Sequence, residues 1–271
     1  MTVVLRVNNK VSPLAGWHYI FPLYLVNNRK WYIGCSGFYY KEWKDVFYPK
    51  GLPQKEWFEY YTKHFNTLEI NSSFYRFPKL ANLKNWHSRS PDNFIFSLKV
   101  PAAITHYKQF RETERMLNDF YGLAREGLTE KLGPVLFQLP PKLVYSKDAL
   151  DVMLAQIDYS FLNAIEFRNS TWWRPDVIAR LKEKNIIFCG VSFPGLEKDK
   201  AIINNATCYY RFHGVPRLFY SCYDDGFLKK VFRQMQKNET WTDAFIYFNN
   251  TASMAALKNG AFVQMLAQKD Q

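Results

Sequence analysis

The stretch Leu68-Glu-Ile-Asn-Ser-Ser-Phe-Tyr75 predicts the end of a buried strand that turns into a loop. Successive side chains of a strand point to opposite faces, so Glu69 and Asn71 share one face. A carboxylate between apolar neighbours costs several kcal/mol unless it is paired or takes part in a site. Three strand ends with alternating polar residues therefore indicate a pocket. The other two are Ile165-Glu-Phe-Arg168 and Tyr210-Arg-Phe-His213.

Strand and helix signals alternate from Trp31 onward. Short apolar runs bounded by turn residues predict eight strands. Because these runs are apolar on both faces, they indicate a parallel sheet that is covered by helices. The strands are predicted over residues 31–35, 67–71, 94–99, 134–139, 162–167, 186–191, 207–212 and 244–248.

Apolar residues at helical spacing predict seven or eight helices between these strands. Two of them are expected to begin at caps, Ser170 or Thr171 and Asn250 or Thr251, and the segment 196–202 predicts one weak turn. Strand–helix units that repeat over residues 31–267 predict a single-domain (β/α)8 barrel, similar to a TIM barrel. An open doubly wound sheet is the alternative. The other helices are predicted over 54–64, 80–89, 111–126, 147–157 and 224–237.

Residues 1–30 are predicted to be an amino-terminal extension ahead of this domain. Residues 14–26 are aromatic and apolar, but they include His18 and Pro22 and are too few to span a bilayer. A signal peptide would need a small-residue cleavage site, and none follows. The other interpretation is an appended segment with partial disorder. We expect no membrane-spanning segment.

The charge of the chain indicates an anionic partner. The 271 residues include 36 Lys and Arg against 24 Asp and Glu, a net charge of +12. Such an excess is typical of proteins that bind nucleic acid, phosphate esters or acidic lipid, although no run of five like charges occurs here. The four cysteines form no C-x-x-C pair, so a reducing, cytoplasmic location is predicted and a structural zinc site is not.

Hydrogen-bonding side chains follow nearly every predicted strand, whereas the strand starts at Trp31, Phe94 and Val135 lack them. In a barrel of this kind the functional face lies at the carboxyl ends of the strands, so this asymmetry predicts a polar pocket there. The candidate residues are Glu69, Asn71, Tyr75, Lys99, His106, Gln138, Glu166, Arg168, Arg211, His213 and Asn249.

Each candidate also has a purely structural interpretation. Glu69, Lys99, Glu166 and Arg168 could form a buried salt-bridge network that stabilises the barrel interior. Gln138 could satisfy backbone groups, and His213 could be a hydrogen-bonded core histidine. Cys35 is interpreted as a small buried residue and not as a nucleophile.

Eight sequence blocks in order resemble the YecE-like family, also called domain of unknown function 72. The resemblance implies a TIM-barrel-like fold with the eleven candidates above as signature positions, and it implies no settled activity. The chain departs from the family at Phe38, where tryptophan is common, and at Val191-Ser192, where an acidic residue is common. The second departure removes a possible metal ligand or base. The blocks are Ile33-Gly-Cys-Ser-Gly37, Phe47-Tyr-Pro49, Glu69-Ile-Asn-Ser-Ser-Phe-Tyr-Arg76, Phe96-Ser-Leu-Lys99 with Ile104-Thr-His106, Gly133-Pro-Val-Leu-Phe-Gln-Leu-Pro-Pro141, Glu166-Phe-Arg168, Arg211-Phe-His-Gly214 and Tyr247-Phe-Asn-Asn250.

The first functional hypothesis is a site for a phosphorylated or nucleic-acid ligand, with hydrolysis as a possible reaction. Lys99, Arg168 and Arg211 outnumber the two glutamates, and His106 and His213 are expected to add positive charge near neutral pH. Glu166, His213 and Glu69 are the candidate catalytic residues, and the other eight candidates are predicted to bind the ligand. No cofactor is predicted. No aspartate stands at a strand end, so no metal centre is predicted either.

Two alternatives stay open. Glu69 and Glu166 could be the carboxylate pair of a carbohydrate hydrolase, which requires the two carboxyl groups to lie about 5–9.5 Å apart. The chain could instead be a non-catalytic module that binds a ligand or a partner, because it has no Walker loop, Rossmann fingerprint or evident nucleophile–base pair. The sequence leaves the substrate and the oligomeric state open.

Overall fold

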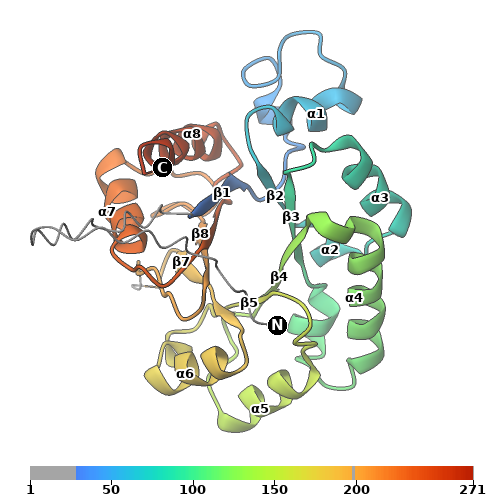
Figure 1. Ribbon diagram of the computed structural model, residues 1–271, viewed down its shortest axis with the longest axis vertical. Coiled ribbons are helices and arrows are strands. Elements are labelled where there is room, and N and C mark those ends of the chain that lie inside the picture. Colours follow the sequence, from blue (N-terminus) through green and yellow to red (C-terminus); the bar gives the residue numbers. More distant parts are fainter. Residues whose placement is uncertain (1–28, 197–198, 271) are drawn as a thin grey trace, which may run out of the picture.

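The computed structural model describes residues 29–196 and 199–270. Within them, nine parallel strands form one sheet in the order β6-β5-β4-β3-β2-β1-β9-β8-β7. Helices surround the ring of strands (Figure 1). The strands are β1 (Lys30–Cys35), β2 (Thr67–Ile70), β3 (Ile95–Lys99), β4 (Leu132–Gln138), β5 (Asn163–Glu166), β6 (Ile187–Phe188), β7 (Gly190–Ser192), β8 (Thr207–Phe212) and β9 (Asp243–Phe248).

The segment that holds β6 and β7 nearly closes the barrel. These two short strands are halves of one extended segment that is interrupted at Cys189. β6 pairs with β5 and β7 pairs with β8, so the segment joins the two ends of the sheet. The predicted (β/α)8 barrel is thereby confirmed and the open sheet is wrong, while the predicted sixth strand is split in two.

Eight α-helices cover the described part of the sheet. Two begin at side-chain caps: Ser146 accepts a hydrogen bond from the Ala149 amide, and Asp224 accepts one from the Phe227 amide. The helices are α1 (Trp57–Thr62), α2 (Ser72–Tyr75), α3 (Leu80–Arg89), α4 (Glu114–Leu128), α5 (Lys147–Gln156), α6 (Pro175–Glu183), α7 (Asp225–Gln236) and α8 (Ala255–Gln268).

The two caps expected for α6 and α8 are wrong. Ser170 and Thr171 lie in a separate 3-10 turn, and α6 begins later, at Pro175, whose fixed φ suits a first helical turn. Likewise α8 begins at Ala255, four residues beyond Thr251. No α-helix lies between β7 and β8 in the residues described there, where only a weak turn was predicted.

The barrel interior is divided into layers. Inward-facing apolar residues form a small cluster of their own, separate from the main core between sheet and helices. Leu136, Ala164 and Tyr209 belong to it, and each precedes a candidate site residue by two positions on the same strand. Residues two apart on a strand share a face, so the polar candidates form the next layer of the barrel interior, toward the carboxyl ends of the strands.

Residues 1–28 lie outside the described residues, so the predicted extension over 1–30 stays a prediction. Among the helices described, none is long and apolar enough to cross a membrane.

Gly34 is expected to be essential for the pairing of β1 with β2. A Cβ atom there would collide with the carbonyl oxygen of Thr67 and lie 2.9 Å from Tyr61 Oη. We expect Gly34→Ala to lower the free energy of unfolding by about 2 kcal/mol or more. Gly122→Ala is the control, because no atom lies within 4 Å of its added Cβ; it should be neutral or stabilising by up to about 1 kcal/mol. Equal urea midpoints for the two variants would contradict the prediction.

Candidate functional site

Arg211 on β8 joins the two glutamates across the barrel mouth. Its Nη2 donates to Glu69 Oε1 at 2.6 Å, and its Nη1 donates to Glu166 Oε2. Tyr209 Oη donates to the second oxygen of Glu69 at 2.6 Å. All four side chains are fully buried. Three strands that are distant in the sequence thus meet in one ion-pair network.

Arg168, His213 and Asn249 complete this network. Arg168 Nε donates to Glu166 Oε1, and the guanidinium lies over the ring of Phe193. His213 Nε2 lies 3.2 Å from Glu166 Oε1 and its Nδ1 lies 2.9 Å from Asn249 Nδ2. Arg168 Nη2 also lies 3.1 Å from this Nε2, so that nitrogen faces both a carboxylate acceptor and a guanidinium donor, while Nδ1 is placed to accept from Asn249.

The network holds its members in defined charge states. Burial alone would raise the pKa of Glu166, but the charges of Arg168 and Arg211 outweigh it and hold that pKa well below its usual value. Burial would lower the pKa of Arg211, but Glu166 and Glu69 raise it well above the ordinary value. Burial and then Arg168 depress the pKa of His213 far below its usual value. His213 is therefore neutral at neutral pH.

Lys99, Gln138 and His106 form a second group at the mouth. Lys99 Nζ donates to Gln138 Oε1 at 3.0 Å and lies 3.9 Å from the ring centroid of Phe74. Only 7% of Lys99 is exposed, and no carboxylate among the described residues lies within 4.0 Å of its Nζ. The side-chain amide nitrogen of Gln138, Nε2, lies 3.4 Å from His106 Nε2. This ammonium group is thus buried beside a neutral acceptor.

The environment of this second group disfavours positive charge. Burial, followed by the charge of Arg211, lowers the pKa of Lys99 to about 7. Burial and the charge of Lys99 lower the pKa of His106 to about 4. The expectation that His106 and His213 add positive charge near neutral pH is therefore wrong, because burial and neighbouring cations keep both rings neutral.

Asn71 and Tyr75 lie beside a cavity of about 430 Å³ next to the mouth, which Glu69 also lines. Ser36 also lines this cavity, and the buried oxygens Ser36 Oγ and Asn71 Oδ1 have no hydrogen-bond partner among the described residues. Tyr75 is 85% exposed and lies at the rim. Cys35 is buried, and burial raises the pKa of its thiol, which supports the structural interpretation.

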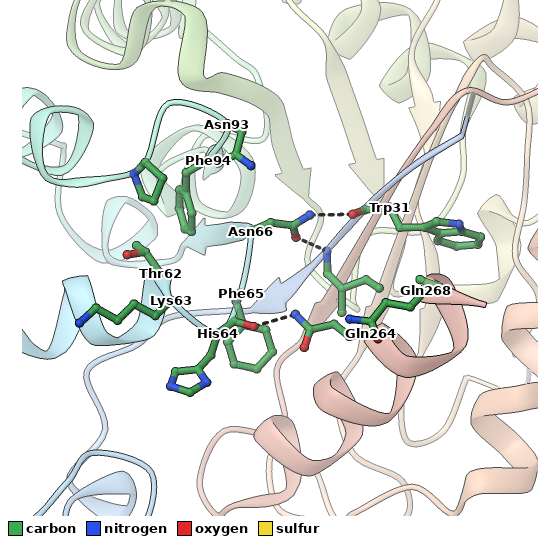
Figure 2. Close-up of a pocket in the computed structure, with 13 residues that line it drawn as sticks. Trp31, Thr62, Lys63, His64, Phe65, Asn66, Asn93, Phe94, Gln264 and Gln268 are labelled. Carbon is green, nitrogen blue, oxygen red and sulfur yellow. Dashed lines mark hydrogen bonds between the residues drawn. The ribbon is translucent and has the colours of Figure 1, made fainter. Parts of the chain in front are cut away.

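A different cavity, of about 320 Å³, lies at the opposite end of the barrel (Figure 2). Two of its polar side chains, Asn66 and Gln264, already bind the backbone. Asn66 Nδ2 donates to Trp31 O at 2.8 Å, and Gln264 Nε2 donates to His64 O at 2.8 Å. Because the starts of barrel strands generally serve stability, we assign this cavity a structural role.

All eleven predicted site residues lie at the carboxyl ends of the strands or in the connections that follow them. Six join the glutamate–arginine network, three form the lysine group, and two line the cavity. Tyr209 was missed, although its position two residues before Arg211 places it on the same face. Phe74 and Trp86 were also missed, and no strand periodicity could have found Trp86 because it lies on α3. No group of three or more His, Cys, Asp or Glu that could hold a metal ion occurs in residues 29–196 and 199–270.

The family model described as "Protein of unknown function DUF72" matches residues 32–271. The chain belongs to the DUF72 family. UPF0759 protein YunF of Bacillus subtilis (strain 168) is 27% identical over 276 residues, which cover 88% of this chain and 94% of YunF. UPF0759 protein YecE of Escherichia coli (strain K12) is 34% identical over 83 residues, 30% of each chain. The resemblance to the YecE-like family is thereby confirmed.

Solved DUF72 structures have the same fold. A DUF72 family protein from Thermotoga maritima MSB8 superimposes with a TM-score of 0.78 at 25% identity and covers 88% of this chain and 99% of its own. A DUF72 family protein from Enterococcus faecalis V583 has a TM-score of 0.74 at 19% identity, covering 89% of this chain and 99% of its own. The second likeness concerns the fold alone.

Proposed function

We propose that the barrel mouth binds the phosphate group of a phosphorylated ligand and that Lys99 is the cation that pairs with it. One observation carries the proposal: Lys99 is buried without a carboxylate partner in the described structure. Burying an ammonium group is costly unless an anion pairs with it. Lysine is also a common phosphate ligand, because it presents a compact point charge.

The other cations of the mouth are already neutralised. Arg168 and Arg211 both bind carboxylates, so their guanidinium groups are not free to grip a phosphate from two points. When Lys99 is protonated and both histidines are neutral, three cations face two carboxylates. The excess charge therefore belongs to Lys99, and a ligand anion would balance it.

The geometry favours binding over hydrolysis. Glu166 uses both oxygens in ion pairs, and its low pKa makes it a weak base. A carbohydrate hydrolase would need one carboxylic acid, and the paired arginines keep Glu166 ionised. Both glutamates are held in ion pairs, which supports a non-catalytic module that binds a ligand. Catalytic roles for Glu166, His213 and Glu69 stay predictions, as does the cytoplasmic location.

Binding of sulfate should test the proposal, because sulfate is a tetrahedral dianion whose charge is constant from pH 6 to pH 9. A bound anion stabilises the charged ammonium group and raises the pKa of Lys99, so binding takes up a proton above pH 7. With an initial pKa of about 7, affinity measured by calorimetry should fall about 100-fold from pH 6 to pH 9.

Two variants make this test specific. Lys99→Met should abolish the pH-dependent component of binding, whereas Lys84→Met should behave as the wild type, because Lys84 lies on the outer helix α3 and pairs with Glu126. Sulfate binding of equal strength by the wild type and Lys99→Met would refute the assignment of Lys99.

A further inference from the structure

Exposed aromatic side chains gather at one end of the barrel. Tyr75 and Tyr107 are 85% and 82% exposed, and three others at this end are also exposed. All five lie in the connections that follow the carboxyl ends of strands, whereas Tyr159 is the one exposed aromatic at the opposite end of the barrel among the described residues. Solvent-facing rings on one face indicate an interaction surface. The three others are Tyr39, Phe219 and Tyr220.

Positive charge is concentrated at the same end. The connections at the carboxyl ends of the strands hold twelve Lys and Arg against five Asp and Glu, a net charge of +7. Those at the amino ends hold six against five. The first set is 36–56, 71–79, 100–113, 139–146, 167–174, 213–224 and 249–254, and the second is 29, 63–66, 90–94, 129–131, 157–162, 184–186, 237–242 and 269–270. The β7–β8 connection belongs to neither set, and its described residues hold one Lys and one Asp.

The cavity beside the mouth has the features of a site for one planar group. Rings form much of its wall, and two lining residues, Ser36 and Asn71, carry a buried side-chain oxygen without a hydrogen-bond partner among the described residues. Its volume of about 430 Å³ falls in the range of about 300–1,000 Å³ that is usual for small-molecule sites. Hydrogen-bonding atoms among aromatic walls suit a nucleobase. The rings are Phe38, Tyr39, Tyr40, Tyr75 and Trp86.

Cations lie near two parts of the cavity wall, Tyr75 and Trp86. On one side, the Phe74 ring lies 3.9 Å from Lys99 Nζ and 5.2 Å from the Tyr75 ring. On the other side, a smaller cavity of about 200 Å³ shares the Trp86 wall and is lined by Arg76 and Lys79. Neither of these two cations forms an ion pair with a residue that the structure describes. Rings and cations therefore alternate along this part of the rim.

We propose that this face binds single-stranded nucleic acid, with one base in the cavity and its phosphate at Lys99. Flanking bases would stack on exposed rings such as Tyr75, and flanking phosphates would lie against Arg76 and Lys79. Unpaired bases expose the π-faces that aromatic residues bind, and each phosphate repeats a charge for a basic groove. The proposal rests on the proposed function and names the class of its ligand.

Fluorescence anisotropy with a labelled 15-nucleotide oligothymidylate should test this inference. The wild type should bind it at least about 10-fold more tightly than a 15-base-pair duplex, because the stacking surface needs unpaired bases. Tyr75→Ala should weaken binding about 5- to 100-fold. Arg76→Ala with Lys79→Ala should reduce the slope of log affinity against log salt concentration by about 1.4, since each phosphate contact with a single strand contributes about 0.7.

Matched controls come from the opposite end of the barrel. Tyr159→Ala removes an exposed ring, and Lys63→Ala with Lys237→Ala removes two exposed cations. Neither control should change affinity or salt dependence appreciably. Tyr75→Ala should retain the wild-type unfolding midpoint, because the side chain it removes is almost entirely in solvent.

The outcomes separate this inference from the proposed function. Sulfate binding through Lys99 without oligonucleotide binding would overturn the inference and leave the proposed function standing. Equal affinity for strand and duplex, with no effect of Tyr75→Ala, would also overturn it. So would Tyr75-dependent binding to phosphatidylserine vesicles without binding to the strand. Strand binding that survives Lys99→Met but requires Tyr75 would support the surface and refute the phosphate site.

Discussion

Replacement of Arg211 by alanine is expected to lower the free energy of unfolding at pH 7.5 by about 3–5 kcal/mol. The change leaves Glu69 and Glu166 fully buried without the cation that lies between them. Removing one partner of a buried ion pair costs more stability than replacing both partners by apolar residues, because the charge that remains is desolvated and unpaired. Urea unfolding followed by circular dichroism would measure the loss.

The pH dependence of this loss has a defined sign. In the wild type the pKa of Glu166 lies well below its unfolded value, so its contribution to stability is present above about pH 4.3 and is lost as the pH falls through the folded value. Without Arg211, burial raises the pKa of Glu166 and only Arg168 and His213 oppose that effect, so Glu166 is protonated more readily in the variant than in the wild type. We therefore expect the deficit to be smaller at pH 5 than at pH 7.5.

A half-exposed ion pair provides the control. Arg180 and Asp151 lie 2.6 Å apart with side chains 37% and 43% exposed. Their interaction is screened by water, so Arg180→Ala should cost less than about 1 kcal/mol. If Arg211→Ala fails to fold, the double variant Arg211→Met with Glu69→Gln should recover part of the stability. The double variant buries fewer unpaired charges than Arg211→Ala does. Equal losses in Arg211→Ala and Arg180→Ala would contradict the role assigned to the network.

Replacement of Lys99 by methionine is expected to stabilise the unliganded protein at pH 7. The pKa of Lys99 falls from about 10.4 in an unfolded chain to about 7 in the folded protein, which makes the buried ammonium group unfavourable. Removing it should raise the free energy of unfolding by about 1–3 kcal/mol, after the loss of the contacts with Gln138 and Phe74 is subtracted. A residue that weakens its own fold is expected where function requires it.

The gain should depend on both pH and ligand. Because the folded pKa is depressed, the wild type recovers stability as the pH rises from about 7 to about 10. The difference between the two proteins should therefore shrink over that range. Saturating sulfate at pH 6.5 should stabilise the wild type and leave Lys99→Met unchanged. Thermal unfolding with and without sulfate would measure both effects.

A second buried lysine is the matched control. Lys131 Nζ donates to His87 O, Ser90 O and Ser90 Oγ at 2.8–3.1 Å near the end of α3. These acceptors satisfy its three protons, so Lys131→Met should destabilise the protein. If both methionine variants lose stability, Lys99 is a structural residue and the phosphate site is refuted.

Periodicity along the chain predicted some features of the structure correctly and others wrongly. Alternation along the second and fifth strands placed Glu69, Asn71 and Glu166 at the barrel mouth, where the structure has them. Apolar spacing predicted α3 over residues 80–89 with its observed bounds. The caps predicted for α6 and α8 are wrong because these side chains have other partners: Thr171 accepts from the Tyr145 amide, and Asn250 donates to Ser221 O and Asn259 Oδ1.

The sequence by itself determined which side chains stand at the carboxyl ends of the strands, since strand alternation and the order of strands and helices are local properties. Only the tertiary structure decided their partners. Arg211 forms ion pairs with Glu69 and Glu166, which lie 142 and 45 residues away in the sequence. Because Arg211 occupies both carboxylates, neither of them pairs with Lys99. The physical reason is that distances across a barrel mouth depend on strand register and closure of the ring, which periodicity along one strand cannot specify.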